Sequence, residues 1–437
     1  MSQPEPRLVA LDPGIPAQSL QTASRETIAA YQMQRLRVGL ERVLAGNPFY
    51  GRKLAGLDPH ALLRLEDLER LSFTEKSELV ADQQDHPPYG TNLTFPLRDY
   101  VRLHQTSGTS GQPLRILDTA ASWDWWADCW TTIYHAAGVT ADDVIFLAFS
   151  FGPFIGFWSA YEGGKRVGAL VVPGGGQSST QRLQAMLATS ATVLVCTPTY
   201  ALHLAEVARE EGIAIQDSAV RVTIHAGEPG ASIPTTRRRI EEAWGARTYD
   251  HIGMTEMGAY AFTCRHQENV HVNEAEFIAE VLDPATGRPV AEGAQGELVL
   301  TNLGRWGTPA IRYRTRDLVV RGPAHCACGR SFMTLPGGVL GRADDMLTVR
   351  GVNVYPSGIE AAVRSVPEVQ EFRITVFKDG EMDEIAVEAE CPAEAVPRVE
   401  EALRRSLSLR VPVQAVPSGT LPRFELKARR VVDKRPH

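Results

Sequence analysis

Hydroxyl and glycine residues are concentrated in one short segment of this 437-residue chain, residues 106–113. Glycine admits unusual backbone angles, so consecutive N–H groups and hydroxyls of such a segment can surround an anion. The segment lacks the terminal Gly-Lys-Ser/Thr of a Walker loop, which argues against an ordinary P-loop NTPase. We predict a phosphate loop, with a mobile Ser/Gly linker as the alternative. Its candidate residues are Thr106, Ser107, Gly108, Thr109, Ser110 and Gly111.

Carboxylate, hydroxyl and arginine side chains stand in three later segments. Thr255 could hydrogen-bond a phosphate and Glu256 could hold Mg²⁺, a hard cation that takes oxygen ligands. Asp317 could accept hydrogen bonds from both hydroxyls of a ribose, and Arg342 could meet a phosphate or the ribose. The alternatives are a turn with a solvated glutamate and ordinary surface salt bridges. Together these residue types are typical of a site for a magnesium nucleotide.

The order of the expected elements indicates an α/β fold. Apolar residues recur at helical spacing over residues 24–44. Short β-rich runs then alternate with helical stretches, which predicts a mostly parallel sheet. After residue 275 turn signals separate strand runs, which indicates a β-rich subdomain, and the end of the chain follows a strand–helix–strand–strand–helix pattern. We predict a large N-terminal domain, residues 1–342, and a small α+β domain, residues 343–437.

The charge balance excludes some classes of protein. With 45 Lys and Arg against 52 Asp and Glu, the net charge of −7 disfavours a general binder of nucleic acid or of an anionic membrane. No signal peptide and no apolar run of spanning length is evident. Six cysteines in a chain of this length do not indicate a disulfide scaffold, so we predict a cytoplasmic protein.

Taken in order, these segments resemble the adenylate-forming superfamily of acyl-CoA synthetases, adenylation domains and luciferases, and above all its phenylacetate-CoA ligase branch. The resemblance covers most of the chain, and residues 341–360 match that branch most specifically. It implies ATP, Mg²⁺ and CoA as cofactors, with an aromatic carboxylic acid as substrate. It assigns residues 226–229 to adenine contact, including Gly227, Glu228 and Pro229, together with Ile252 and Gly253. In the family an aromatic residue often precedes this glycine and stacks on adenine, whereas this chain has Ile252.

The resemblance also supplies a catalytic lysine and a hinge. The branch ends in a Gly-Lys-Ala-x-Arg-Val pattern, which places Lys427 in the catalytic position and Leu426 where the glycine would be. Asp344 matches the hinge about which the small domain rotates between adenylation and thioester formation. The implied activity is that of an AMP-forming aryl-acid CoA ligase. The alternative is an adenylating enzyme that passes the aryl group to a carrier protein or an amine, and a homodimer is a further expectation.

Three cysteines and a histidine could hold zinc. Cys264, Cys326 and Cys328 offer thiolates and His271 an imidazole, with His266 as the alternative ligand. Such a set makes a closed tetrahedral site, which is structural because no position is left for water. Unliganded buried cysteines are the alternative, because the spacing is not that of a paired C-x-x-C knuckle.

Aromatic residues interleaved with glycine follow the strand that ends near Ala148. Phe149, Phe151 and Phe154 would suit a flat ring, although ordinary core packing gives the same pattern. His225 and His251 flank the expected adenine and acid region, and either could hydrogen-bond an ortho amino or hydroxyl group. The candidate acids are therefore phenylacetate, benzoate, anthranilate and hydroxybenzoate.

Overall fold

The computed structural model describes most of the chain. The described residues are 17–106, 113–153, 155–228, 230, 232–343, 347–349, 352–379, 382–407, 409–424 and 430–435. Several predicted site residues lie outside these ranges: Ser107, Gly108, Thr109, Ser110, Gly111, Phe154, Pro229, Asp344 and Lys427. For these residues the roles proposed above stay predictions.

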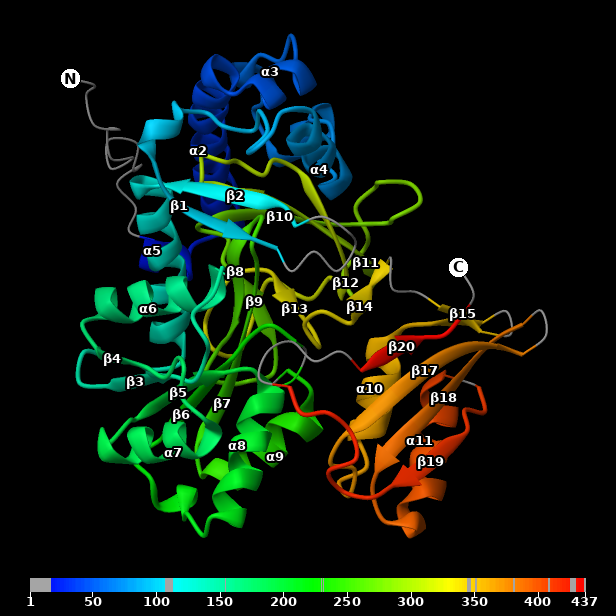
Figure 1. Cartoon of the computed structure of the whole chain (residues 1–437). Helices are drawn as coiled ribbons and strands as arrows, with labels where there is room; N and C mark the ends of the chain where they lie inside the picture. The colour runs from blue at the N-terminus through cyan, green and yellow to red at the C-terminus, as the bar shows by residue number, and fades with distance from the viewer. Residues whose placement is uncertain are drawn as a thin grey trace.

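A sheet of eight described strands forms the centre of the large unit (Figure 1). Its parallel part has the order β4–β3–β5–β6–β7, and β8, β9 and β13 extend it in antiparallel fashion beyond β7. The strands are β3 (Val144–Leu147), β4 (Leu170–Pro173), β5 (Val193–Cys196), β6 (Val222–His225), β7 (Arg247–Met254), β8 (Gly258–Thr263), β9 (Val270–Val272) and β13 (Thr334–Leu335).

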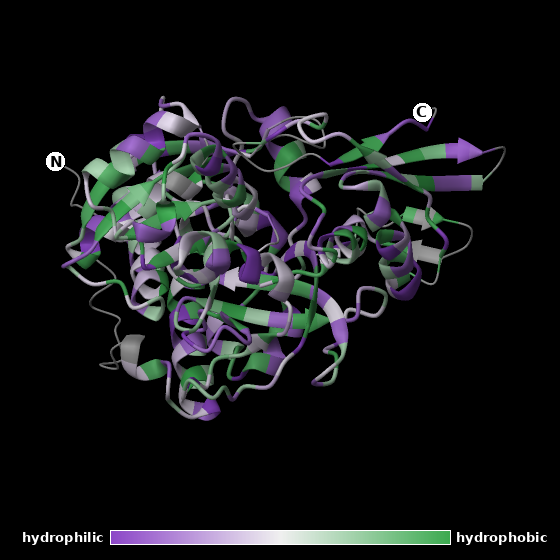
Figure 2. Ribbon diagram, turned by 90° about the horizontal axis from the view of Figure 1, so that it is seen from below, coloured by the Kyte–Doolittle hydropathy of each residue, from purple (hydrophilic) through white to green (hydrophobic). Residues whose placement is uncertain are grey.

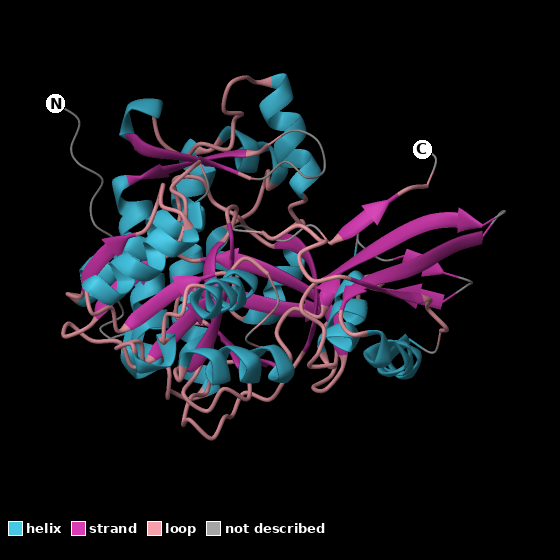
Figure 3. Cartoon of the chain, turned by 60° about the horizontal axis from the view of Figure 1, so that its bottom comes forward, coloured by secondary structure: helices cyan, strands magenta, loops and turns pink. Residues whose placement is uncertain are grey.

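Helices cover this sheet because parallel strands need crossover connections, which here are helical (Figure 3). The helices are α5 (Ala120–Ala136), α6 (Ile155–Val167), α7 (Ser179–Ala188), α8 (Pro198–Glu210) and α9 (Pro234–Trp244). Thr197 caps the N-terminus of α8 by accepting a hydrogen bond from the Tyr200 N–H, and Pro198 occupies the first helical position. The carboxyl ends of β5 and β6 therefore lead directly into the region of the predicted nucleotide site.

The β-rich part of the large unit is an antiparallel sheet of order β10–β11–β12–β14. Its strands are β10 (Phe277–Leu282), β11 (Gln295–Asn302), β12 (Tyr313–Val320) and β14 (Gly341–Arg342), and β1 (Tyr100–Gln105) pairs separately with β2 (Arg115–Thr119). The N-terminal helices are α1 (Ala17–Leu20), α2 (Arg25–Gly46), α3 (Pro48–Lys53) and α4 (Lys76–Asp85). Arg25 fastens α2 to the segment before β10 by a bidentate bond to Glu274.

The C-terminal unit has its own sheet, of order β19–β18–β17–β20, and its own cluster of buried apolar residues. Its elements are β15 (Leu347–Val349), β16 (Val352–Val354), α10 (Pro356–Arg364), β17 (Phe372–Asp379), β18 (Met382–Glu390), α11 (Val396–Leu407), β19 (Val413–Val416) and β20 (Val431–Asp433). The strands of both units carry many hydrophobic residues (Figure 2). The predicted mixed α/β fold is confirmed, while the boundary between residues 342 and 343 stays a prediction.

Across the described ranges, no helix combines the length and the apolar character that crossing a bilayer requires.

Candidate active site

The predicted phosphate loop starts where β1 ends. Thr106 is buried, and its N–H donates to the Leu114 carbonyl at 3.0 Å. In return, the Leu114 N–H donates to the Thr106 hydroxyl, also at 3.0 Å. This reciprocal pair closes the two ends of the segment onto each other. Thr106 is thus fixed by the strand pair β1–β2 at the base of the predicted loop.

Glu256 lies just after β7 and its carboxylate is buried. Its Oε1 is 2.9 Å from the Lys76 ammonium at the start of α4 and 3.4 Å from the Tyr313 hydroxyl, which donates to it. Burial, with the Glu256 charge as the next cause, raises the pKa of Tyr313 well above its usual value. Tyr313 therefore stays a hydroxyl donor at neutral pH.

Asp317 on β12 lies opposite Arg342 on β14 in the strand register. Its Oδ2 accepts a hydrogen bond from the Tyr260 hydroxyl at 3.2 Å. Burial, followed by the Asp317 charge, raises the pKa of Tyr260 well above its usual value. The structure therefore brings together the predicted residues Glu256, Asp317 and Arg342 around two tyrosines. We call Glu256, Asp317, Tyr260, Tyr313 and Lys76 the oxygen cluster.

A buried ion pair holds the Thr255 segment in place. The Arg305 guanidinium binds both carboxylate oxygens of Asp118 at 2.7 Å, and both side chains are fully buried. The same guanidinium donates to the Thr255 carbonyl at 2.5 Å. Such a pair is expensive to break, because removal of one partner leaves an uncompensated buried charge. Thr255 is thereby positioned by its backbone.

The donor set of the oxygen cluster fits a magnesium nucleotide. Mg²⁺ is commonly held by one or two carboxylates together with substrate phosphates and water. Glu256 offers one such carboxylate, and the cation now beside it is the Lys76 ammonium, whose side chain is 37% exposed. An ammonium that reaches the solvent can withdraw, so a metal ion can take its place at Oε1.

The predicted adenine segment follows β6. Gly227 has a φ of +93°, which favours glycine. The Glu228 side chain contacts α8, where its Oε1 accepts a hydrogen bond from the Thr199 N–H at 2.9 Å. Its Oε2 lies 3.7 Å from the guanidinium of Arg430, a residue of the C-terminal unit. Ile252 on β7 packs against the core as a partly buried residue.

The two predicted histidines have different surroundings. His225 on β6 uses both ring nitrogens within the sheet: Nδ1 lies 3.0 Å from the Cys196 carbonyl and Nε2 lies 2.9 Å from the Thr223 hydroxyl. His251 on β7 meets the Trp130 ring edge-on at 4.4 Å, and its Nδ1 has no hydrogen-bond partner among the described residues. Burial lowers the pKa of each histidine to about 4. Of the two, His251 is better placed to receive a polar group.

The predicted aromatic pocket residues also differ in exposure. Phe149 is fully buried, and Gly253 lies on β7 with the His251 ring close by. Phe151 is only partly buried and contacts the Trp158 ring edge-on at 4.8 Å. Phe151 is therefore the described phenylalanine of this set that reaches the surface.

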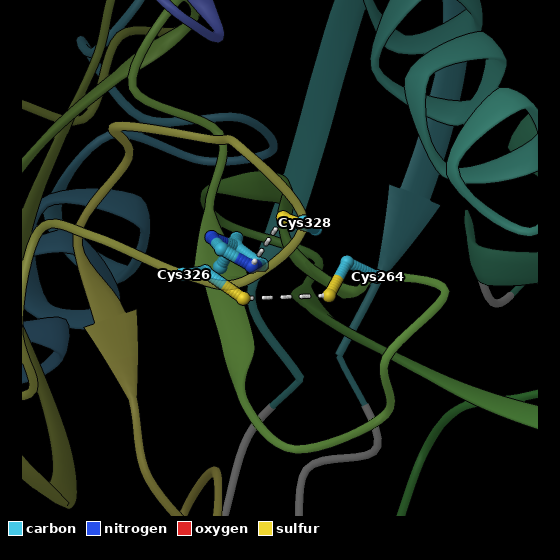
Figure 4. A group of neighbouring side chains, drawn as sticks. Cys264, Cys326 and Cys328 are labelled. Atoms are coloured by element: carbon cyan, nitrogen blue, oxygen red, sulfur yellow. Dashed lines mark hydrogen bonds between the residues drawn. The ribbon is translucent and has the colours of Figure 1, made fainter.

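The predicted zinc ligands meet between β8, β9 and the loop at residues 326–328 (Figure 4). The ligand atoms of Cys264, His271, Cys326 and Cys328 all lie within 4.8 Å of one another. The sulfurs of Cys264 and Cys326 are 3.8 Å apart, and Cys328 Sγ is 3.6 Å from His271 Nε2. Ordinary zinc bond lengths in a tetrahedron give edges of about 3.8 Å and 3.6 Å. The group therefore fits zinc, and His266 is exposed and outside it. We call these four residues the sulfur cluster.

Comparison with known proteins places the chain in a family. The AMP-binding enzyme family matches residues 8–304, and the AMP-binding enzyme C-terminal domain matches residues 351–435. The chain belongs to the AMP-binding enzymes. The family predicted from the motifs is thus confirmed. Phenylacetate-coenzyme A ligases from Thermus thermophilus and Pseudomonas putida are both 32% identical to this AMP-binding enzyme over 95% of its length, and the matches cover 98% and 96% of those relatives.

A solved 2-hydroxyisobutyryl-CoA ligase is 31% identical over 97% of this AMP-binding enzyme and 94% of that chain. In its postadenylation state, with an acyl-AMP bound, it superimposes with a TM-score of 0.90. Its open conformation gives 0.74 and its thioesterification state 0.73. The two units of this chain are therefore arranged as in the postadenylation state.

Proposed function

We propose that this AMP-binding enzyme is an AMP-forming acid–CoA ligase that activates an aryl acid of the phenylacetate type. The observation that carries the proposal is the oxygen cluster together with the neighbouring Arg342: Glu256 lies just after β7, Asp317 on β12 and Arg342 on β14 of the large unit. Full-length similarity to phenylacetate-coenzyme A ligases supports the choice of acid and of CoA.

The proposed reaction has two steps. A carboxylate oxygen of the acid first attacks the α-phosphorus of ATP, so that pyrophosphate leaves and an acyl-adenylate forms. The CoA thiolate then attacks the acyl carbon, and AMP leaves with the electron pair of the carbon–oxygen bond. Negative charge grows on the phosphate oxygens in the first step, and preorganised donors stabilise this charge. The removal of one such donor typically lowers the rate roughly 10²–10³-fold. Lys427 and the loop at residues 106–111 are proposed to supply these donors.

The oxygen cluster would hold the nucleotide. Asp317 is proposed to accept hydrogen bonds from the ribose hydroxyls, with Tyr260 beside it and Arg342 across the strand pair. Glu256 would hold a magnesium ion, and Thr255 would bond a phosphate oxygen. Magnesium supplies charge neutralisation at the phosphates.

Acid-dependent exchange of labelled pyrophosphate into ATP tests the first step. The panel should contain phenylacetate, benzoate, anthranilate and 2-hydroxybenzoate, and the expected best acid is phenylacetate. A clear preference for an ortho-substituted acid that is lost in His251→Phe would assign His251 to that substituent. Absence of exchange with every acid would overturn the proposal, and replacement of Lys427 by Ala should abolish the exchange.

A short branched hydroxy acid is the second candidate substrate. The 2-hydroxyisobutyryl-CoA ligase superimposes on the chain with a TM-score of 0.90 and is 31% identical to it, so 2-hydroxyisobutyrate belongs in the same panel. Exchange that is faster with this acid than with phenylacetate would favour a small pocket over an aryl pocket.

The acceptor of the acyl group is tested by product analysis. Incubation of the chain with ATP, acid and either CoA, a carrier protein or free amines should give acyl-CoA as the main product. A main product on the carrier protein or the amine would favour the alternative adenylating enzyme.

The cytoplasmic location, the homodimer and the hinge at Asp344 are further proposals. For Asp344→Pro we expect the loss of one half-reaction and the retention of the other.

We also propose that the sulfur cluster binds a structural zinc ion. The support is that the four ligand atoms lie within 4.8 Å of one another and that two of the distances between them, 3.8 Å and 3.6 Å, are those of a zinc tetrahedron. Four protein ligands leave no open position, so this ion would stabilise the fold and take no part in the reaction.

A further inference from the structure

Polar side chains make several of the described contacts between the C-terminal unit and the large unit. The buried apolar residues of the two units form separate clusters in the described ranges. A cavity of about 690 Å³ lies between α8, α9 and residues 367–370, where the C-terminal unit lies beside these helices (Figure 1). Close apolar packing therefore does not hold this part of the interface together. The polar side chains that bridge the two units then contribute more to keeping them in place.

Arg430 is the most deeply buried of these bridging side chains. It lies three residues after Lys427 and directly before β20, where its carbonyl accepts a hydrogen bond from the Ile374 N–H at 2.7 Å. Within the C-terminal unit its guanidinium binds Glu371 at 2.6 Å and Glu360 at 3.2 Å. Both its backbone and its side chain are thus fixed to the C-terminal unit.

The same guanidinium reaches across to the large unit. Nη2 donates to the Thr199 hydroxyl at 2.9 Å, and Nη1 lies 3.7 Å from Glu228. Glu228 belongs to the predicted adenine segment, and its other oxygen accepts from the Thr199 N–H. One side chain therefore links the sheet of the C-terminal unit to the edge of the predicted nucleotide site. We call the contacts of Arg430 with Thr199 and Glu228 the Arg430 bridge.

Two other contacts across the interface involve arginines that are less deeply buried than Arg430. Arg423 lies 3.5 Å from Glu206 of α8, and both side chains are about a quarter exposed. Ion pairs that reach the solvent contribute little, because water competes for both partners. Arg239 of α9 donates to the Val369 carbonyl at 3.1 Å. In the Arg430 bridge the guanidinium, Thr199 and Glu228 are almost fully buried, so water competes less for the hydrogen bond to Thr199 and for the ion pair with Glu228.

We infer that Arg430 is a positioning residue that holds the C-terminal unit in the present arrangement, which matches the postadenylation state of the solved relative. The inference rests on the proposed two-step function. Any rotation that presents the C-terminal unit differently for the thiol step must break the Arg430 bridge, while the bonds to Glu371 and Glu360 travel with the unit. The bridge therefore favours the first half-reaction and opposes the change to the second.

Thr199→Val is the sharpest test. It removes the hydroxyl that Arg430 bonds and keeps both the side-chain shape and the N–H that serves Glu228. We expect pyrophosphate exchange to fall roughly three- to tenfold, as for the loss of one buried hydrogen bond. Thioester formation from purified acyl-adenylate and CoA should be unchanged or faster. Glu206→Gln, which removes the more exposed pair, is the matched control and should leave both rates unchanged.

Arg430→Lys gives an independent check. Lysine keeps a positive charge for Glu371 but lacks the second nitrogen that reaches Thr199, so it should reproduce the Thr199→Val split between the half-reactions. In the double variant the two effects on exchange should not add. Equal loss of both half-reactions, full additivity, or no effect of Thr199→Val would overturn the role of Arg430.

Small-angle X-ray scattering with ATP present separates this inference from the proposed function. The wild-type profile should match the arrangement described above, and the Thr199→Val profile should shift towards another arrangement, while Glu206→Gln stays with the wild type. Identical profiles for wild type and Thr199→Val would overturn the bridge. Absence of exchange in the wild type would overturn the proposed function and would leave the scattering result to decide on the bridge.

Discussion

The sulfur cluster and the oxygen cluster both gather metal-ligand residues in the large unit, yet they are built differently. In the sulfur cluster the ligand atoms are nearest neighbours of one another, at the spacing of a tetrahedron. In the oxygen cluster Glu256 and Asp317 already have other partners, the Lys76 ammonium and the tyrosine hydroxyls. The first arrangement suits the structural ion that we propose, whereas in the second the proposed nucleotide and metal ion would replace partners that are already present.

Glu256→Gln should have the largest effect on catalysis. The amide keeps the size of the side chain but removes the charge that would hold magnesium, so pyrophosphate exchange should fall roughly 10²–10³-fold. Because Gln can still accept from Tyr313, the melting temperature should change little. A loss of exchange that is matched by a large drop in melting temperature would show that Glu256 serves the fold instead.

Cys264→Ser should lower the stability of the fold and spare catalysis, whereas Glu256→Gln should lower catalysis and spare stability. Metal analysis should find close to one zinc ion per chain in the wild type. In the variant we expect the zinc content to be well below that level. The loss of a structural metal should destabilise the fold by about 1–3 kcal/mol and lower the melting temperature by roughly 2–6 °C. Exchange measured well below that temperature should persist. Cys391→Ser, outside the cluster, is the control, and zinc-free wild type would refute the site.

Lys76→Met should have a smaller effect, confined to the oxygen cluster. If Lys76 occupies the place that magnesium takes, its removal should lower the magnesium concentration for half-maximal exchange. A partly exposed ion pair limits this shift to roughly two- to fivefold. A strong loss of exchange at saturating magnesium would instead make Lys76 a phosphate ligand.

Acid should lower the free energy of unfolding through histidines outside both clusters. Near neutral pH this loss of stability should be smaller than the effects of the substitutions. Burial lowers the pKa of His225 and of His251 from 6.5 to about 4, so the unfolded chain binds more protons between these values. Stability should therefore decline as the pH falls from about 6.5 towards 4. Melting curves of wild type and Cys264→Ser should share this slope, and a slope present only in the wild type would trace it to the sulfur cluster.

Local sequence patterns predicted most of the elements. The helix predicted over residues 24–44 is α2, with Ser24 as its cap, and the strand–helix–strand–strand–helix pattern predicted for the end of the chain appears as β16, α10, β17, β18 and α11. These elements follow from periodicity and capping, which neighbouring residues decide. The attachment of β13 to the distant strand β9 has no such local signal, because only the tertiary fold brings residues 334–335 beside residues 270–271.

The same limit applies to the site. Glu256, Asp317 and Arg342 were predicted because they stand in characteristic segments, and Tyr313 opens one of these segments. Lys76 and Arg305 were missed, because their partners Glu256 and Asp118 are 180 and 187 residues away in sequence. Arg430 was known only as part of a terminal pattern, and its role depends on contacts with Thr199 in the other unit.

The hollow of about 690 Å³ beside α8 and α9 has a practical consequence. It is lined by both units, including Arg239 of the large unit and Pro367 of the C-terminal unit, so its shape exists only while they are docked in this way. A compound that fills this cavity would oppose any rotation of the C-terminal unit relative to the large unit. Such an inhibitor would need no likeness to ATP, to the acid or to CoA, because it would bind between the two units and not at the proposed nucleotide site.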